Sequence, residues 1–275
     1  MKIKTITCHD VYNLGASLQA HALAHYLKAQ GHDVEIIDYK PYYLRHYELT
    51  GVRNPRFDKP LLRQMYQIAK FPGRLIAQLD PRKKAFDRFK KEFLPVTPVT
   101  YTSNEELKAN PPEADLYIAG SDQIWNPLFP NGKDPAFFLD FVPQGKKKVS
   151  YAASFAVDRL EAEERLRMQT WLNRFDAISV REKSGTKLVS QMFINAVQTC
   201  DPVFLLDREY WAQYVGKKQR KPYCFVYDFE DDEKLGQIAR QIAARKNLWI
   251  ISAFKNKSAD EICRGLGPFE FRIIS

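Results

Sequence analysis

The 275-residue chain lacks the patterns that mark several classes of protein. Its four cysteines stand far apart and form no CxxC pair, which favours isolated thiols over a disulfide framework. No apolar run approaches the ~20 residues that a helix needs to span a bilayer. The N-terminus, Met1–Lys4, leads directly into a strand pattern and has no signal-peptide signature. We therefore expect a cytoplasmic protein, which could act at the inner face of the membrane.

Histidine is also missing from most of the chain, because none follows His46. His21 and His25 stand four residues apart on one face of a predicted helix, but the sequence places no third ligand beside them. Ala22 stands where an HExxH zinc motif has glutamate. We therefore expect no metal and no cofactor.

The formal net charge of +9 favours acidic partners without identifying one. Anionic sugars, phosphates and an anionic membrane surface all fit this charge. Zinc-finger spacing, RRM-type aromatics and a recognition-helix pattern are absent, so we expect no nucleic-acid partner.

What is present is a regular alternation of strand and helix patterns in a chain that is 45% hydrophobic. A strand at 3–7, a helix at 17–30 and a strand at 34–38 form a βαβ start, which predicts a parallel sheet. After a helical insertion at about 55–95, broken at Pro72-Gly73 and Pro81, the alternation resumes. Its later strands are expected at 116–119, 148–154 and 177–180, and its helices at 159–175 and 182–192. The pattern predicts an α/β fold with a Rossmann-type, doubly wound parallel sheet.

A change of composition at 216–222 indicates a linker between two domains. We assign residues 1–216 to an N-terminal Rossmann-like domain, 217–222 to the linker and 223–275 to a second α/β domain. The second domain begins with strand, helix and strand patterns at 223–228, 232–246 and 248–252. It is expected to be incomplete, with an exposed sheet edge that favours self-association.

The segment Gly120–Pro127 is the most informative stretch of the chain. It follows a predicted buried strand, and ligands bind at the carboxyl ends of strands in open α/β sheets. We expect Asp122 to be catalytic, as a base or by orienting a hydroxyl. The substrate-binding residues expected beside it, including an apolar wall from the tryptophan, are Ser121, Gln123, Trp125 and Asn126. The alternative is an Asx-turn at Asp122 with the tryptophan anchored in the core.

Four further residues are candidates for substrate binding. Asn13 and Gly15 open the first helix, whose free amide groups could bind an anion, although Asn13 could equally serve only as the helix cap. Ser154 ends a strand of small residues, where close helix packing is the alternative explanation. Arg181 lies where a strand meets a helix and could bind a carboxylate or phosphate, or a carboxylate of the chain itself.

The helix predicted at 82–93 places Phe86, Phe89 and Phe93 on one face with lysines around them. Such a stripe could rest on an anionic membrane. The alternative is that it packs against its own domain.

Five stretches, taken in order, resemble the polysaccharide pyruvyl transferase family: 13–20, 120–126, 150–155, 179–182 and 200–203. The resemblance covers roughly residues 1 to 255. It implies a two-domain GT-B-like fold and the transfer of a pyruvyl group from phosphoenolpyruvate to a sugar hydroxyl of a cell-surface glycan. The implied partners are phosphoenolpyruvate and a glycan or lipid-linked saccharide acceptor, which would face Asp122 and Asn126.

The sequence departs from the family in one respect. Donor binding in the family depends on a histidine motif in the second domain, and here no histidine follows His46. The resemblance therefore implies a truncated or frameshifted member with little or no catalysis. Two alternatives remain open: a non-catalytic module that binds a glycan or a partner, and a GT-B glycosyltransferase that uses a nucleotide sugar.

Overall fold

The computed structural model describes residues 1–45, 60–214, 221–228, 230–254 and 256–262. The chain divides into two compact units, which are described separately below. Unit 1 comprises Met1–Leu75 and Lys90–Asp207, and unit 2 comprises Ile76–Phe89 and Arg208–Ser275. Of the predicted linker at 217–222, residues 217–220 lie outside the described part of the chain.

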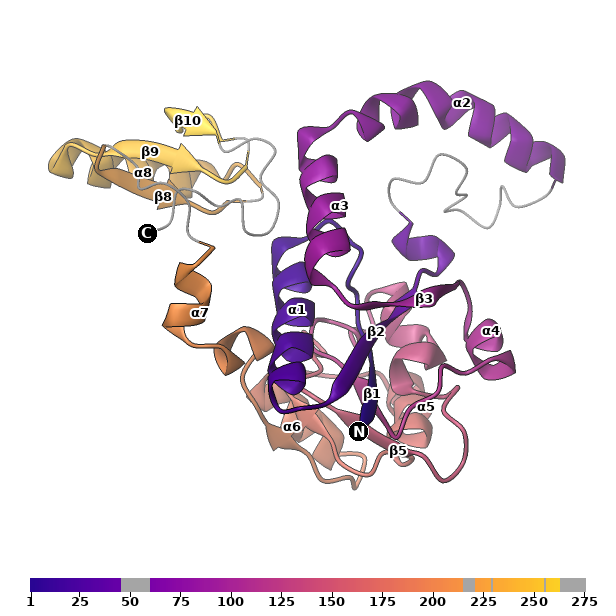
Figure 1. Cartoon of the computed structure of the whole chain (residues 1–275). Helices are drawn as coiled ribbons and strands as arrows, with labels where there is room; N and C mark the ends of the chain where they lie inside the picture. The colour runs from indigo at the N-terminus through magenta and orange to yellow at the C-terminus, as the bar shows by residue number, and fades with distance from the viewer. Residues whose placement is uncertain (46–59, 215–220, 229, 255, 263–275) are drawn as a thin grey trace. The chain divides into compact units, whose positions relative to one another are not determined.

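Unit 1 is built on a five-stranded sheet in the order β3-β2-β1-β4-β5, in which all neighbours are parallel (Figure 1). The order reverses at β1, whose two neighbours are β2 and β4. With helices flanking this sheet, the fold is of the predicted GT-B-like α/β class. The strands are β1 (Lys2–Ile6), β2 (Asp33–Tyr39), β3 (Val96–Tyr101), β4 (Leu116–Ala119) and β5 (Lys147–Ser150).

Two short strands continue this arrangement beyond β5. β6 (Ser179–Val180) pairs in parallel with β7 (Val197–Gln198), and the bridges Val149–Ala177 and Ala153–Val180 join β6 to the segment around β5. The strand predicted at 148–154 ends earlier, at Ser150, because Ala152 turns the backbone with a φ of 51°. The segments of chain that follow β4 and β5 therefore lie beside β6 and one another.

The helices of unit 1 connect these strands. α1 (Leu14–Ala29) lies on one side of the sheet, and α4 (Asn104–Ala109) and α5 (Ala162–Leu172) lie on the other, as Figure 1 shows. α6 (Lys183–Ser190) follows β6. At the end of α1 the chain turns through Gly31, whose φ of 82° suits glycine.

The predicted helical insertion consists of α2 (Pro60–Gln78) and α3 (Pro81–Phe93). The break expected at Pro72-Gly73 was wrong, because α2 continues through Pro72. A proline removes one helical hydrogen bond, and the neighbouring bonds sustain this helix.

The membrane alternative for α3 was also wrong, because Phe86 and Phe89 are buried within the protein.

The core of unit 1 contains a cluster of aromatic rings that includes Trp125 from the segment after β4. Trp125 stacks on Phe138 at 5.4 Å between ring centroids and lies 5.4 Å from the ring of Phe155. All three side chains are fully buried.

Among the described residues, no helix has the length and apolar character to cross a membrane.

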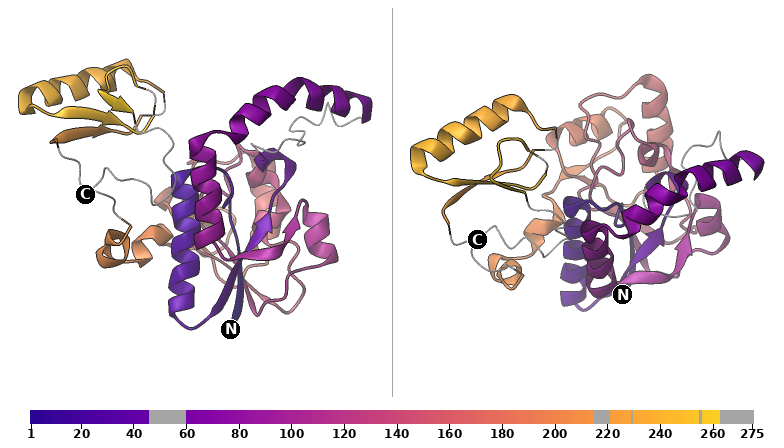
Figure 2. Two further views of the ribbon diagram at one scale, coloured as in Figure 1. Left: turned by 45° about the horizontal axis from the view of Figure 1, so that its top comes forward. Right: turned by 90° about the horizontal axis from the view of Figure 1, so that it is seen from above.

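Unit 2 contains a parallel three-stranded sheet in the order β10-β9-β8 (Figure 2). One helix connects β8 to β9 along the chain. Its elements are α7 (Arg208–Ala212), β8 (Tyr223–Val226), α8 (Glu233–Lys246), β9 (Trp249–Ser252) and β10 (Glu261–Ile262). Asp232 caps α8 by accepting a hydrogen bond from the Leu235 amide at 3.0 Å. Self-association through the edge of this sheet stays a prediction.

Candidate functional site

Two of the residues predicted from the sequence, Ser121 and Asp122, follow the carboxyl end of β4 beside β1, where the strand order reverses. The Thr7 hydroxyl donates a hydrogen bond to the Ser121 carbonyl at 2.8 Å and accepts one from Gln19 Nε2 at 3.0 Å. Gly120 permits this close approach, since a Cβ there would lie 3.3 Å from the Ile6 carbonyl oxygen. The switch point of an open sheet is the usual place for a ligand.

Asp122 occupies a strained and electrostatically unusual position beside this contact. Its φ of 79° is rare for a residue other than glycine, and its Oδ1 accepts a hydrogen bond from the Gln123 amide at 2.8 Å. Burial raises the pKa of the Asp122 carboxyl, with the Gln123 amide and Arg181 acting in the opposite direction. The carboxyl thus keeps its proton to a higher pH than an ordinary aspartate, which suits proton transfer.

Arg181 lies near Asp122 but is paired with a carboxylate that the sequence analysis did not select. Arg181 donates to Asp201 Oδ2 at 3.1 Å, and the Ser121 hydroxyl donates to the same oxygen at 3.3 Å. Asp201 Oδ1 accepts from the Val203 amide at 3.1 Å, which fixes the carboxylate. This is the local pair that the sequence left open. The half-buried guanidinium has further N–H groups with which to bind an anion.

Ser154 is held by a second carboxylate and is not exposed. Its hydroxyl donates to Glu182 Oε1 at 2.6 Å, and the Ala156 amide donates to the same oxygen at 2.8 Å. Glu182 Oε2 is buried and has no hydrogen-bond partner among the residues that the structure describes. In this arrangement the buried Ser154 holds the loop after β5 through Glu182, and substrate binding by its hydroxyl stays a prediction.

The structure corrects the roles expected of two residues in Gly120–Pro127. Trp125 is not an exposed wall, because it is fully buried and donates its indole N–H to the Phe137 carbonyl at 3.0 Å. Asn126 is also buried, and it holds the turn by donating to Gln123 Oε1 at 2.9 Å and accepting from the Leu128 amide at 3.0 Å. Gln123 is exposed and stays a candidate for substrate contact.

At the start of α1 the structure shows the capping interaction. Asn13 accepts a hydrogen bond from the Ala16 amide at 3.1 Å. Gly15 is exposed, and a Cβ there would meet Asn13 Oδ1 at an ordinary 3.4 Å. Close backbone approach by a ligand at Gly15 stays a prediction.

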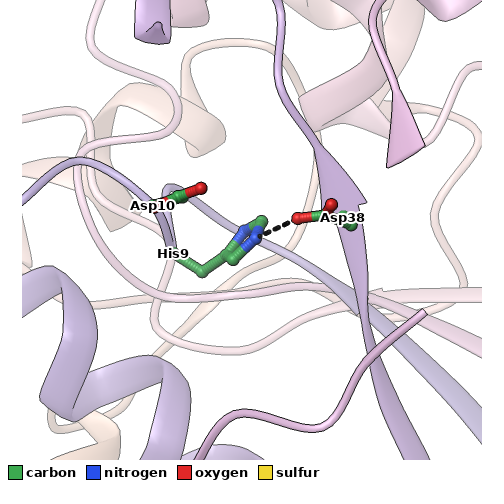
Figure 3. Close-up of side chains that lie close together, drawn as sticks. All are labelled: His9, Asp10 and Asp38. Atoms are coloured by element: carbon green, nitrogen blue, oxygen red, sulfur yellow. Dashed lines mark hydrogen bonds and ion pairs between the residues drawn. The ribbon is translucent and has the colours of Figure 1, made fainter. Parts of the chain in front are cut away.

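A charged cluster at the ends of β1 and β2 was missed by the sequence analysis. Figure 3 shows His9 pointing toward Asp38, with Asp10 in the same loop as His9. His9 Nε2 lies 3.0 Å from Asp38 Oδ1, and His9 Nδ1 lies 3.3 Å from the Thr7 carbonyl oxygen. Ligand atoms of His9, Asp10 and Asp38 lie within 4.8 Å of one another, which is a geometry that could hold a metal ion.

Two lysines compensate the charge of this cluster. Lys90 Nζ lies 2.8 Å from Asp10 Oδ2 and 3.3 Å from Asp38 Oδ1, and Lys40 Nζ lies 3.2 Å from each carboxylate. Burial alone would raise the pKa of Asp38, but hydrogen bonds from His9 and Thr100 and the charge of Lys90 hold it well below its usual range. The ammonium groups therefore occupy the positions in which a cation would be bound.

The sequence did contain a signal for this cluster. His9 and Asp10 follow the first predicted strand and Asp38 ends the second, and the carboxyl ends of neighbouring parallel strands meet at one edge of a sheet. Lys90 had no such signal, because it comes from the helical insertion.

Comparison with known proteins identifies the family. Residues 13–272 match the family model described as "Polysaccharide pyruvyl transferase". The chain belongs to this family. The match extends well past residue 255, where the sequence resemblance was expected to end, and it includes most of unit 2. It therefore gives no support to the predicted truncation. A search of curated proteins found no match.

In this pyruvyl transferase family member, two cavities open beside the segment that follows β4. The larger has a volume of about 660 Å³ and the smaller about 490 Å³, and Leu128 lines both. The backbone of Gly132 packs directly against that of Asn126, and a Cβ at position 132 would fall 2.0 Å from the Asn126 carbonyl oxygen. The lining of the larger cavity includes Pro127, Ala156, Asp158, Arg159 and Ser184.

Proposed function

We propose that the chain transfers a pyruvyl group from phosphoenolpyruvate to two hydroxyls of one sugar in a glycan, forming a ketal. The family match supports this reaction class. The observation that carries the assignment of the site is Asp122, a carboxyl with a raised pKa next to Arg181 at the switch point of the sheet.

The proposed reaction requires two proton movements. One sugar hydroxyl adds to C2 of the enol while C3 takes up a proton and becomes a methyl group. A second hydroxyl of the same sugar then replaces phosphate at C2 and loses its proton. The two hydroxyl protons are thus balanced by one C–H bond and one proton on the departing phosphate. Asp122 would relay a proton between hydroxyl and enol, because its raised pKa lets the carboxyl keep a proton to a higher pH than an ordinary aspartate does.

Arg181 would bind an anionic group of the donor. Phosphoenolpyruvate carries several negative charges, and a guanidinium binds a carboxylate or phosphate through paired hydrogen bonds. Asp201 holds the guanidinium in place through its 3.1 Å contact. The acceptor would be a glycan or a lipid-linked saccharide, and the protein would act in the cytoplasm at the inner face of the membrane.

The direct test is an assay with phosphoenolpyruvate and a hydroxyl-rich glycan. Inorganic phosphate is measured in solution, and the new methyl group of the ketal is measured by proton NMR. We expect Asp122→Asn to reduce both signals by about 100-fold or more and Asp158→Asn, an exposed position in the larger cavity, to retain them. Equal phosphate release from the wild-type chain and Asp122→Asn would contradict the proposal.

The two alternatives give different results. A non-catalytic glycan-binding module would bind a saccharide without releasing phosphate, and the two cavities make that outcome physically reasonable. A glycosyltransferase that uses a nucleotide sugar would be stabilised against heat by uridine or guanosine diphosphate. The pyruvyl transfer proposal predicts no such stabilisation.

A further inference from the structure

The smaller cavity lies entirely in unit 1 and has the composition of a ligand site. It opens between the chain that follows β2 and the loop after Asn126, and its volume of about 490 Å³ falls in the range of small-molecule sites. None of its residues was selected from the sequence. Its lining includes Tyr42, Tyr43, Leu128, Phe129, Lys133 and Asp134.

The polar part of the cavity is the Asp134 carboxylate. Asp134 Oδ2 accepts hydrogen bonds from the Tyr39 hydroxyl at 2.6 Å and the Tyr43 hydroxyl at 2.5 Å, and Oδ1 accepts from the Ala136 amide at 2.9 Å. Burial raises the pKa of both tyrosines, so they stay protonated as donors. Each carboxylate oxygen can accept two hydrogen bonds. Among the contacts of the described residues, Oδ1 therefore has capacity for one more donor.

Exposed apolar side chains form the sides of the cavity. The exposed fraction is 48% for Tyr42, 51% for Phe129 and 75% for Leu128. Exposed large apolar side chains gathered on a cavity indicate a binding surface, because leaving them in water costs free energy that a ligand can recover. The exposed Lys133 adds hydrogen-bond donors beside Asp134.

This combination selects among ligand classes. A wholly apolar ligand would leave the Asp134 carboxylate without its remaining donor, and a nucleotide would place phosphates close to that carboxylate. A pyranose has an apolar C–H face that packs on an aromatic ring and hydroxyl groups around its edge that donate to a carboxylate. A sugar ring therefore matches both the apolar sides of the cavity and its Asp134 carboxylate.

The cavity is also linked to the proposed reaction site. Asn131 donates a hydrogen bond to the Gln123 carbonyl, which ties the loop that carries Lys133 and Asp134 to the residue next to Asp122. Burial raises the pKa of the Cys8 thiol, and the charges of Asp122 and Asp134 raise it further, so the two carboxylates lie within electrostatic range of one group.

We propose that the cavity between Tyr42 and Phe129 binds one pyranose unit of the acceptor glycan, with its C–H face on the aromatic rings and a hydroxyl on Asp134. The acceptor role rests on the proposed function, whereas the binding of a sugar ring does not. In this arrangement the cavity selects the acceptor and binds it at the loop that Asn131 ties to Gln123, the residue after Asp122.

The test uses the full chain and methyl glycosides of glucose, galactose and mannose, with binding measured by saturation-transfer NMR. We expect at least one of them to bind, and we expect Phe129→Ala and Tyr42→Ala each to weaken its Kd by about tenfold, the loss of one aromatic contact. Phe193→Ala, which removes a ring that is 95% exposed elsewhere in unit 1, should leave the Kd unchanged. Circular dichroism checks that each variant is folded.

Two outcomes would overturn the sugar site: no binding of any of the three glycosides, or equal binding by Phe129→Ala and the wild-type chain. These outcomes are separate from failure of the proposed function, because no donor or turnover is involved. Binding without phosphate release from phosphoenolpyruvate would retain the sugar site and reject pyruvyl transfer. Turnover with an acceptor KM unchanged in Phe129→Ala would retain pyruvyl transfer and reject the acceptor role of the cavity.

Discussion

The Thr7 hydroxyl donates to the Ser121 carbonyl oxygen at 2.8 Å, and this bond joins the ends of β1 and β4 where the sheet reverses its strand order. Both residues are buried, so water does not compete for the bond. The contact holds the backbone that leads into Asp122, and it therefore links the stability of the sheet to the geometry of the proposed reaction site.

Replacing Thr7 by valine keeps the shape of the side chain and removes the hydroxyl. The Ser121 carbonyl loses its donor and Gln19 Nε2 loses one acceptor, so we expect a loss of about 2 kcal/mol in the free energy of unfolding. Urea denaturation measures this change. Thr170→Val removes an exposed hydroxyl on α5 and should change stability by less than about 0.5 kcal/mol. Equal effects of the two substitutions would show that the Thr7 contact has no special role.

Asp122→Asn should separate catalysis from stability. Because burial raises the pKa of Asp122 in the folded chain, the folded state binds its proton more tightly than the unfolded state does. This favours folding at low pH, and the contribution is lost as the pH rises through the folded pKa. Asparagine carries no charge for burial to disfavour, so we expect the variant to be at least as stable as wild type at pH 7. We expect its phosphate release to be reduced by about 100-fold or more. A destabilised variant would show that the carboxylate is structurally required.

Asp38→Asn should destabilise the chain strongly. The substitution leaves Lys40 and Lys90 with only Asp10 to balance two ammonium charges, and breaking a buried ion pair in this way costs about 3 kcal/mol. The lowered pKa of Asp38 means that its contribution is fully present above the unfolded pKa of 3.8 and is lost as the pH falls below it. Denaturation curves at pH 7 and pH 3 should therefore differ less for the variant than for wild type. Parallel pH dependence of the two proteins would contradict this account.

His21 should make stability fall between pH 6.5 and about 4. Burial lowers the pKa of His21 from 6.5 to about 4, with the neighbouring His25 acting in the same direction and the Phe93 carbonyl opposing it. In this interval the unfolded chain binds a proton that the folded chain does not, so the free energy of unfolding decreases as the pH falls, by about 3 kcal/mol over the whole interval.

Thermal unfolding across this pH range measures the effect. His21→Gln should flatten the dependence, whereas His32→Gln, which removes an imidazole from the turn after α1, serves as the matched control. A dependence that is unchanged in His21→Gln would assign the loss of stability to other groups.

Patterns of local origin could be predicted from the sequence, and contacts of distant origin could not. The βαβ start, the cap at Asn13 and the turn after β4 each depend on a few adjacent residues, so strand and helix periodicity and capping chemistry were sufficient. Lys90 reaches the charged cluster from a helix, and Tyr42 and Asp134 reach the smaller cavity from separate loops. No local sequence pattern indicates that such distant residues meet. Trp125 was misassigned because an aromatic residue beside polar ones has the same sequence pattern whether it faces ligand or core.

Gly132 limits how this part of the molecule can be altered. A Cβ there would fall 2.0 Å from the Asn126 carbonyl oxygen, with the backbone of Pro127 also within 3 Å. Any larger residue would force apart the two stretches of chain that carry the reaction segment and the sugar cavity. Engineering of acceptor preference should therefore exchange the rings at positions 42 and 129 and leave the spacing between the two stretches intact. The side chains on the rim are adjustable, whereas the distance between the stretches is fixed by a backbone contact.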